Sequence, residues 1–260
     1  MNPLVALFVN LLFGFYYLLG NLGSSIIVVT LLIRLALLPL VLPSLKSGRK
    51  MQELQPELKR LQDKYGKNKT ALATAQMELY KKKGVNPLSG CLPNILQIVV
   101  LMLFFSAFNM VSGYVDGRVN AETINGQLIA PFKIQEDFRF SDHFLGVKLS
   151  ETPTKMVKNG MSINLLLPLV LLLGSAYLQH WTAKRMLPAS APKDTAYTKQ
   201  TPGEGDDMMA AMRTQSTYMM PMMTLFIGLN FSIGILIYWF VNSLTIAGQQ
   251  LIMAKSEAKK

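Results

Sequence analysis

Four long stretches of this chain of 260 residues carry only one formal charge between them. They cover residues 24–43, 85–114, 160–182 and 214–254. A helix rises 1.5 Å per residue, so roughly 20 apolar residues cross the ~30 Å hydrocarbon core of a bilayer. Each of the first three stretches therefore predicts one membrane span. The fourth is long enough for two, with a break at the turn-like sequence "GLNFSIG".

The composition agrees with a membrane protein. Half of the residues are apolar and only 16% are charged, and the mean hydropathy is +0.29. This charged fraction is low for a soluble domain. The single Cys91 and the two histidines, His143 and His180, exclude a disulfide framework and a Cys/His metal site, and no cofactor is expected. We predict an all-α polytopic membrane protein with five transmembrane helices.

Basic residues between the spans predict the orientation. Residues 44–84 carry eleven Lys or Arg and four Asp or Glu, whereas residues 113–159 carry six of each. Cytoplasmic loops are enriched in Lys and Arg. The N-terminus and residues 113–159 are therefore expected outside the cell, and residues 44–84 and the basic C-terminal tail in the cytoplasm.

The first twenty residues contain no charge. Asn10, Gly14, Tyr17 and Asn21 recur every three or four positions, which places them on one face of a helix. We predict a helix that lies on the outer membrane surface. The alternative is a sixth span, which would place the N-terminus inside and leave the rest of the topology unchanged.

Residues 44–84 show two apolar helical faces separated by "YGKNK", where Gly66 and Asn68 are candidates to end one helix and cap the next. Pro56 lies within the first helix and should kink it. Two helices joined by a short break predict an antiparallel cytoplasmic hairpin, and the alternative is a solvated basic loop on anionic lipid. The first face is formed by Met51, Leu54, Leu58, Leu61 and Tyr65, and the second, which ends at Gly84, by Ala71, Leu72, Ala75, Leu79 and Tyr80.

These patterns divide the chain into one membrane domain, residues 1–253, and a short basic tail, residues 254–260. The predicted segments are an outer interfacial helix (1–21), span 1 (24–43), the cytoplasmic hairpin (44–84), span 2 (91–113), an external segment (114–159), span 3 (160–182), a cytoplasmic loop (183–213), span 4 (214–230) and span 5 (233–253).

Arg34 lies near the middle of the first predicted span, about ten residues from either end. Its guanidinium remains protonated in proteins, and a charge at the centre of a span is unfavourable by about 2.5–3.5 kcal/mol on insertion scales. None of the predicted spans contains an Asp or Glu. Each membrane surface lies ~15 Å away, too far for the Arg34 side chain to extend its guanidinium readily to the lipid head groups. We therefore predict a hydrophilic groove that holds water around Arg34.

Polar residues spaced along one face of a span are candidates to line this groove. Tyr238, Asn242, Thr245 and Gln249 recur at four, three and four in the last span. For each residue alone, the alternative is a simple hydrogen bond between helices. The candidate substrate-groove residues are Arg34, Thr30, Asn94, Gln97, Tyr238, Trp239, Asn242, Thr245 and Gln249.

Motifs for the common enzyme classes are missing. The sequence contains no phosphate-binding loop, no H-E-x-x-H or G-x-S-x-G motif, and no pair of carboxylates within the spans. No inverted repeat of the transporter kind is visible. We therefore expect no catalytic residues, no metal and no enzyme activity.

Four sequences resemble, in order and spacing, the YidC / oxidase-assembly family of membrane protein insertases. They are "SSIIVVTLLIRLALLPL", "MQELQPELKRLQDKYG", "LYKKKGVNPLSGCLPNILQ" and "GILIYWFVNSLTIAGQQ". The resemblance implies a five-helix core with a groove open to cytoplasm and lipid, a cytoplasmic hairpin and an external amphipathic helix. It matches Arg34 to the groove arginine, Thr30 to its neighbour, Gln97 to the glutamine of the second span, and Trp239 or Tyr238 to the aromatic residue of the last span.

We expect the sequence to depart from the family's larger members by having no large external domain and no signal or lipid-anchor segment before the first span. Its external segment is longer than in minimal members, and its short basic tail argues against tail-mediated ribosome binding.

We expect an insertase or chaperone that moves hydrophobic segments and short polar tails of nascent membrane proteins into the bilayer without ATP. An anion transporter or channel using Arg34 and a purely structural assembly chaperone are the alternatives. Expected partners are nascent membrane proteins and the lipid bilayer, with the Sec translocon, the ribosome and the signal recognition particle as further candidates; nucleic acid is not expected. The missing Arg/Ser-rich presequence favours a bacterial plasma membrane over an organelle.

Overall fold

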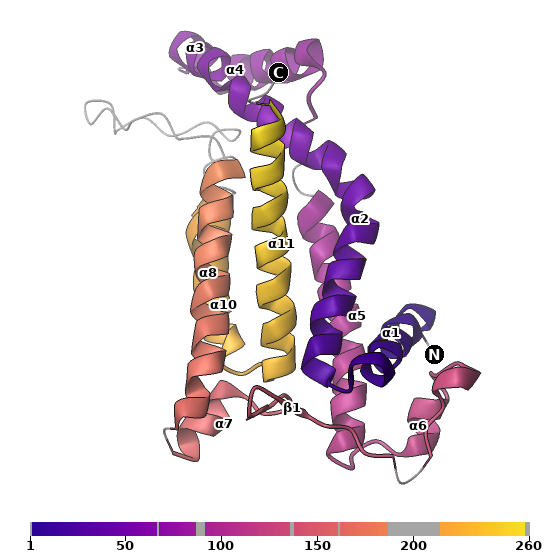
Figure 1. Ribbon diagram of the computed structural model, residues 1–260. Coiled ribbons are helices and arrows are strands. Elements are labelled where there is room, and N and C mark those ends of the chain that lie inside the picture. The colour runs from indigo at the N-terminus through magenta and orange to yellow at the C-terminus, as the bar shows by residue number, and fades with distance from the viewer. Residues whose placement is uncertain are drawn as a thin grey trace. The chain divides into compact units, whose positions relative to one another are not determined.

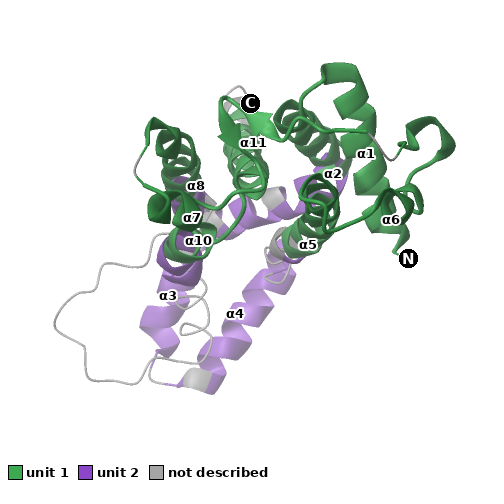
Figure 2. Cartoon of the chain, turned by 90° about the horizontal axis from the view of Figure 1, so that it is seen from below, with its two compact units in different colours: residues 1–37, 96–178, 222–260 green, residues 38–95, 179–221 purple. Residues whose placement is uncertain are grey.

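The computed structural model describes residues 2–66, 68–86, 92–135, 138–160, 162–186 and 214–257. The chain forms two compact units (Figure 2), and each is described by itself. Unit 1 contains residues 1–37, 96–178 and 222–260, and unit 2 contains residues 38–95 and 179–221. Most of the predicted loop 183–213 and the last three residues of the tail lie outside the described residues.

Helices dominate the secondary structure (Figure 1). They are α1 (Pro3–Leu19), α2 (Leu22–Glu53), α3 (Gln55–Tyr65), α4 (Lys69–Lys83), α5 (Leu92–Val115), α6 (Ala121–Asn125), α7 (Pro153–Lys158), α8 (Leu166–Met186), α10 (Met220–Gly228) and α11 (Ile233–Glu257). Short 3₁₀ turns cover Ala130–Phe132 (η2) and Ile163–Leu165 (η3), a π-helical turn covers Gln215–Met219 (η4), and two strands cover His143–Phe144 (β1) and Val147–Lys148 (β2).

Among the described residues, four helices are long and apolar enough to cross a membrane, which confirms a helical polytopic membrane protein. Their candidate spans are Leu22–Met51, Ile95–Val115, Ile163–Arg185 and Ile233–Ala254. None of these spans contains an Asp or Glu. In the region of the predicted fourth span, η4 leads into α10, which has nine residues. The break between α10 and α11 falls at the expected "GLNFSIG", and the count of five spans stays a prediction.

Helix α2 is longer than predicted. Residues 44–53, assigned to the hairpin, continue the first span, and α2 runs for 32 residues. Pro39 and Pro43 lie inside it. A proline deprives the helix of one hydrogen bond, and the other bonds of its turn remain, so the helix continues. The helical run that carries the first apolar face is interrupted at Leu54, two residues before Pro56, which agrees with the predicted kink. Pro56 itself lies in the first turn of α3, where its missing N–H leaves no hydrogen bond of that helix unmade.

Unit 2 contains the expected pair of helices. Gly66 ends α3, and the side chain of Asn68 accepts a hydrogen bond from the Ala71 N–H (3.1 Å) and caps α4. The start of α3 contacts the end of α4, so the two helices are antiparallel, and Lys83 pairs with Glu57 at 2.6 Å. The predicted first apolar face is divided between the end of α2 and α3. The buried cluster consists of Met51, Leu54, Leu58, Tyr80 and Val85.

In unit 1, the described residues between α5 and α8 (116–135, 138–160 and 162) fold into a structure that we call the cap. Figure 1 shows α6, β1 and α7 at one end of α5, α8 and α11. Ile124 and Leu149 of this segment are fully buried in the same hydrophobic core as Phe104 and Phe108 of α5. The polar, charged composition of residues 113–159 concealed these core positions.

The polar face of α1 contacts this cap. Asn10 Nδ2 donates a hydrogen bond to the Gln127 carbonyl (2.7 Å), and its Oδ1 accepts one from the Ile129 N–H (2.8 Å). Tyr17 stacks on Phe132 with ring centroids 6.1 Å apart. The spacing that placed Asn10 and Tyr17 on one helix face therefore marks a protein contact, and the Asn10 amide satisfies backbone groups of an irregular segment.

Candidate functional site

Arg34 lies in α2 and is half-buried. Its Nε and Nη2 atoms donate hydrogen bonds to Oδ1 of Asn242, and Nη2 also donates to Oε1 of Gln97. The Gln97 amide nitrogen in turn donates to the Tyr238 hydroxyl at 3.2 Å. These four residues, the Arg34 cluster, join three helices of unit 1 through neutral groups.

The spacing along α11 explains how the cluster assembles. Tyr238 and Asn242 are four residues apart, so both face the same side of the helix. Both are almost fully buried, with 1% and 3% of their surface exposed. Gln97 on α5 presents its carbonyl to the guanidinium and its amide nitrogen to the phenol, so one side chain serves both neighbours.

The charge on Arg34 is balanced by dipoles. Within the described part of the chain, no carboxylate forms an ion pair with Arg34. A guanidinium has five N–H donors in a planar fork, and the bonds above use Nε and Nη2. The two donors on Nη1 have no hydrogen-bond partner among the described residues. They are free to bind a further acceptor.

Four other residues that were predicted to line the groove do not belong to the Arg34 cluster. Thr30 is buried, and its hydroxyl donates to the Ile26 carbonyl of its own helix at 2.6 Å. The Thr245 hydroxyl likewise donates to its own helix, at Val241. Trp239 contacts the Phe231 ring with centroids 5.6 Å apart. Gln249 lies seven residues beyond Asn242, half-buried on α11. The Asn94 side chain lies outside the described residues.

Sequence reasoning missed Phe104, which stacks on the Tyr238 ring at 4.3 Å between centroids. Phe104 is fully buried and lies seven residues, about two turns, after Gln97 on α5. That spacing was a usable signal, since it places the ring and the amide on one face. The stack fixes the tyrosine that receives the Gln97 hydrogen bond.

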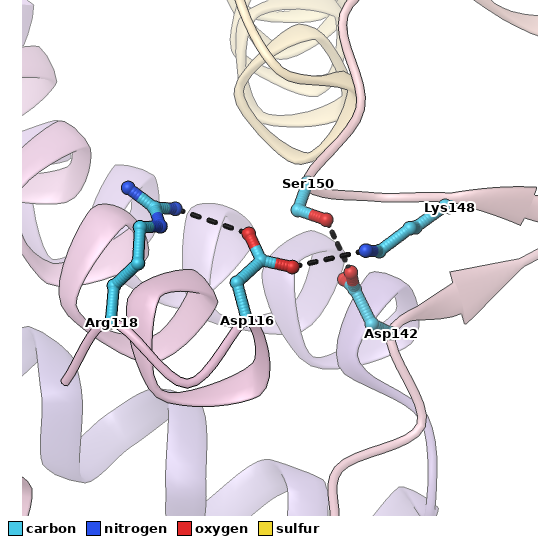
Figure 3. Close-up of polar contacts among 5 residues, drawn as sticks. All are labelled: Asp116, Arg118, Asp142, Lys148 and Ser150. Atoms are coloured by element: carbon cyan, nitrogen blue, oxygen red, sulfur yellow. Dashed lines mark hydrogen bonds and ion pairs between the residues drawn. The ribbon is translucent and has the colours of Figure 1, made fainter. Parts of the chain in front are cut away.

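A second group of charged side chains lies outside the spans, in the cap (Figure 3). We call Asp116, Arg118, Asp142, Lys148 and Ser150 the Asp142 cluster. Asp116 accepts from Lys148 (3.0 Å) and Arg118 (3.1 Å). Asp142 is 3% exposed and accepts from the Ser150 hydroxyl at 2.6 Å, while its Oδ1 has no hydrogen-bond partner among the described residues.

The pKa values of the two acids in this cluster are shifted in opposite directions, upward for Asp142 and downward for Asp116. Burial raises the pKa of the Asp142 carboxyl above its ordinary value, and the hydrogen bonds from Ser150 only partly oppose this. Burial also acts to raise the pKa of Asp116, but hydrogen bonds from Lys148 and Arg118 outweigh it and leave that pKa below its ordinary value.

The described residues contain no group of three or more His, Cys, Asp or Glu side chains arranged to hold a metal ion. The Arg34 cluster offers donors and amide oxygens, and it holds no nucleophile with an adjacent base. This arrangement suits the reversible binding of an acceptor group.

Comparisons with a protein-family model and with known proteins all point to the same family. Residues 14–260 match the family described as "60Kd inner membrane protein". A protein of Streptomyces avermitilis named membrane protein insertase YidC is 30% identical over 237 residues, which is 90% of this chain and 51% of the relative. A protein of the same name from Dinoroseobacter shibae is 34% identical over 92% of this chain and 34% of the relative.

The fold also resembles that of a solved structure. It is described as a crystal structure of an active YidC insertase with the first transmembrane domain resolved. It matches with a TM-score of 0.55 and 25% identity, and the match covers 93% of this chain and 44% of that one. The chain spans about half or less of the length of the relatives it matches. Because the family match covers nearly the whole chain, this protein belongs to the 60Kd inner membrane protein family, whose relatives above are named YidC insertases.

Proposed function

We propose that this protein is a membrane protein insertase and chaperone that binds acidic or polar tails of nascent membrane proteins at Arg34. The observation that carries the proposal is a guanidinium within a candidate span that is held by neutral amides and keeps two N–H donors unused by the described residues. The names of the relatives support it. Nascent membrane proteins are the proposed substrates.

The energetics favour a site of this kind. An apolar substrate helix gains roughly 0.3–0.6 kcal/mol for each Leu-like residue that enters the bilayer. The barrier is the polar tail that must cross first. We propose that water reaches Arg34 through a hydrophilic groove, which shortens the distance that the tail crosses without solvent. The gain from burying the apolar segment then supplies the free energy, and no ATP is required.

The mode of binding follows from the chemistry of the Arg34 cluster. A substrate carboxylate accepts hydrogen bonds from the Nη1 donors while Asn242 and Gln97 keep the rest of the fork oriented. Since these amides carry no charge, they do not repel the carboxylate, and they do not neutralise Arg34 permanently. The substrate is attracted and released as its apolar segment moves into lipid.

We further propose that the N-terminus and the cap lie outside and the α3–α4 hairpin lies in the cytoplasm, as the Lys and Arg distribution indicates. A membrane potential that is negative inside then favours the outward passage of each acidic tail residue by ~2.3 kcal/mol per 100 mV. The Sec translocon, the ribosome and the signal recognition particle remain candidate partners.

The test is Arg34→Ala in liposomes that contain only the purified protein and a single-span substrate. We expect insertion of a substrate with an acidic tail to fall at least tenfold, the scale of ~1.4 kcal/mol of lost interaction. Insertion of the same substrate with Asn and Gln in its tail should change much less. Lys46→Ala, which removes an exposed cation from the same helix, is the matched control and should insert like the wild type. Equal insertion of the acidic substrate by wild type and Arg34→Ala would refute the role of Arg34.

A further inference from the structure

The two-stranded hairpin of the cap has an unusual turn. His143 pairs with Lys148 and Phe144 pairs with Val147, so Leu145 and Gly146 form a two-residue turn. Both have positive φ, 50° at Leu145 and 79° at Gly146. Turns of this type favour Asn, Asp or Gly, because a side chain in the left-handed region crowds the backbone.

Leucine is poorly suited to this position if the turn is surrounded by water. Among the described residues, Leu145 is the one non-glycine residue with positive φ. Its side chain is also 74% exposed. A strained backbone and an exposed large apolar side chain at one residue are reasons to look for a function there.

Contacts with two spans fix the position of the hairpin. Gly23 lies in the first turn of α2, and the ring of Phe144 occupies the space where a Cβ would stand, 2.4 Å from the ideal Cβ position. Asn21 Nδ2 donates to the His143 carbonyl at 3.0 Å. The start of a candidate span, at Leu22, therefore lies beside the hairpin.

A second contact involves α11. The N–H groups of Ile233 and Gly234 donate to the carbonyls of Glu151 (2.9 Å) and Leu149 (3.0 Å). Ile233 is the first residue of another candidate span. Strand β2 ends one residue before Leu149, so both ends of the hairpin are attached where apolar spans begin.

We propose that Leu145 is a membrane anchor of the cap, which inserts into the boundary between lipid head groups and acyl chains. Two other strongly exposed apolar residues lie at or close to the start of a candidate span: Leu18 (74%), four residues before Leu22, and Ile163 (82%), the first residue of a third candidate span. The lipid surface covers these residues where the spans enter the bilayer. Because the hairpin is attached beside Leu22 and at Ile233, where two candidate spans begin, this surface is the one that Leu145 contacts, and the contact would hold the cap at a fixed depth.

The inference is independent of insertase activity, so its test uses a spectroscopic readout. In a Cys91→Ser background, an environment-sensitive fluorophore is attached to Leu145→Cys and the protein is reconstituted in vesicles of phosphatidylcholine and phosphatidylglycerol. Leu166→Cys, on the exposed face of a span, and Glu122→Cys, an exposed charged position in α6, are the two references.

We expect the label at position 145 to show blue-shifted emission and quenching by nitroxide lipids, like the label at position 166. The label at position 122 should instead be quenched by aqueous iodide. If position 145 behaves like position 122, the anchor is refuted, and a protein partner becomes the better candidate for covering the turn.

A second measurement leaves the turn intact. A phosphatidylcholine with a photoactivatable group near the acyl carbonyl is mixed into the vesicles, and adducts on the wild-type protein are mapped by mass spectrometry. We expect adducts at residues 143–148, and we expect Leu145→Asn to lose them, because asparagine suits the turn and lacks the apolar side chain. Absence of adducts from the wild type, or equal labelling of both proteins, would overturn the proposal.

Discussion

The Arg34 cluster and the Asp142 cluster treat a buried charge in different ways. Arg34 remains protonated in proteins, so the fold must stabilise its charge, and it does so with amide oxygens from two other helices. Asp142 can become neutral by taking up a proton, and it has one oxygen without a hydrogen-bond partner among the described residues. A permanent charge requires fixed dipoles, whereas a titratable one can adapt to incomplete solvation.

We expect the Arg34 cluster and the Asp142 cluster to have different roles. The Arg34 cluster lies within candidate spans, where a spare cationic donor is rare and suggests a function. The Asp142 cluster belongs to the cap, which contacts the first turn of α11 through Leu149 and Glu151. Changes to the first should alter substrate insertion, and changes to the second should alter stability and its dependence on pH.

The largest effect should come from giving Arg34 a charged partner in place of its neutral amides. Asn242→Asp places a carboxylate where the amide oxygen accepts from Arg34, and the resulting ion pair competes with the substrate carboxylate. We expect insertion of an acidic-tailed substrate in liposomes to fall at least tenfold, on the order of 1.4 kcal/mol. A neutral-tailed substrate should insert nearly as before. If both substrates insert at wild-type rates, neutrality of the site is unimportant.

A smaller effect is expected from Arg34→Lys. The ammonium keeps the charge but lacks the planar fork that binds Gln97 and Asn242 while leaving Nη1 available. Insertion of the acidic-tailed substrate should fall a few-fold, between the wild type and Arg34→Ala. A variant as inactive as Arg34→Ala would show that guanidinium geometry, in addition to charge, is required.

The smallest effect should be on the stability of the cap. The raised pKa of Asp142 means that the folded state favours its protonated form. Stability from this group is therefore present at low pH and is lost as the pH rises through the raised pKa. At neutral pH, Asp142→Asn should increase the free energy of unfolding in detergent by roughly 1 kcal/mol, the scale of one buried polar group. The gain should disappear in acid.

Asp116→Asn is the matched control, because the pKa of Asp116 is lowered and its contribution is present above the ordinary carboxyl pKa and lost as the pH falls. This variant should therefore lose stability at neutral pH and match the wild type in acid. Changes of the same sign in both variants would contradict the assigned difference between the two acids.

Spacing in the sequence pointed to part of the Arg34 cluster, and the role of these residues in binding substrate stays a prediction. The four-residue step from Tyr238 to Asn242 and the absence of acids from the spans indicated a polar face near Arg34. Thr30 and Thr245 could not be sorted from true partners in this way, because a hydroxyl in a helix can bond to its own backbone. Phe104 was missed because its type alone is ordinary in an apolar span; only its seven-residue spacing from Gln97 could have indicated it.

The fold was predictable to a similar degree. Long apolar runs predict helices, and Gly66 and Asn68 mark the ends of α3 and α4, because these signals are local. The end of α2 was placed ten residues too early, since loss of hydropathy after residue 43 does not break a helix. The short hairpin β1–β2 was also missed, because its turn contains Leu145 in place of the usual Asn.

The sequence by itself determined that the chain is a polytopic helical membrane protein with an arginine lacking an acidic partner in its spans. These properties depend on hydropathy and charge, which are written along the chain. Only the tertiary structure decided that Gln97 and Asn242 hold Arg34, and that Asn10 and Tyr17 contact the cap. Residues 63 to 208 positions apart meet at the first site, and such contacts depend on how helices pack against one another, which local pattern does not specify.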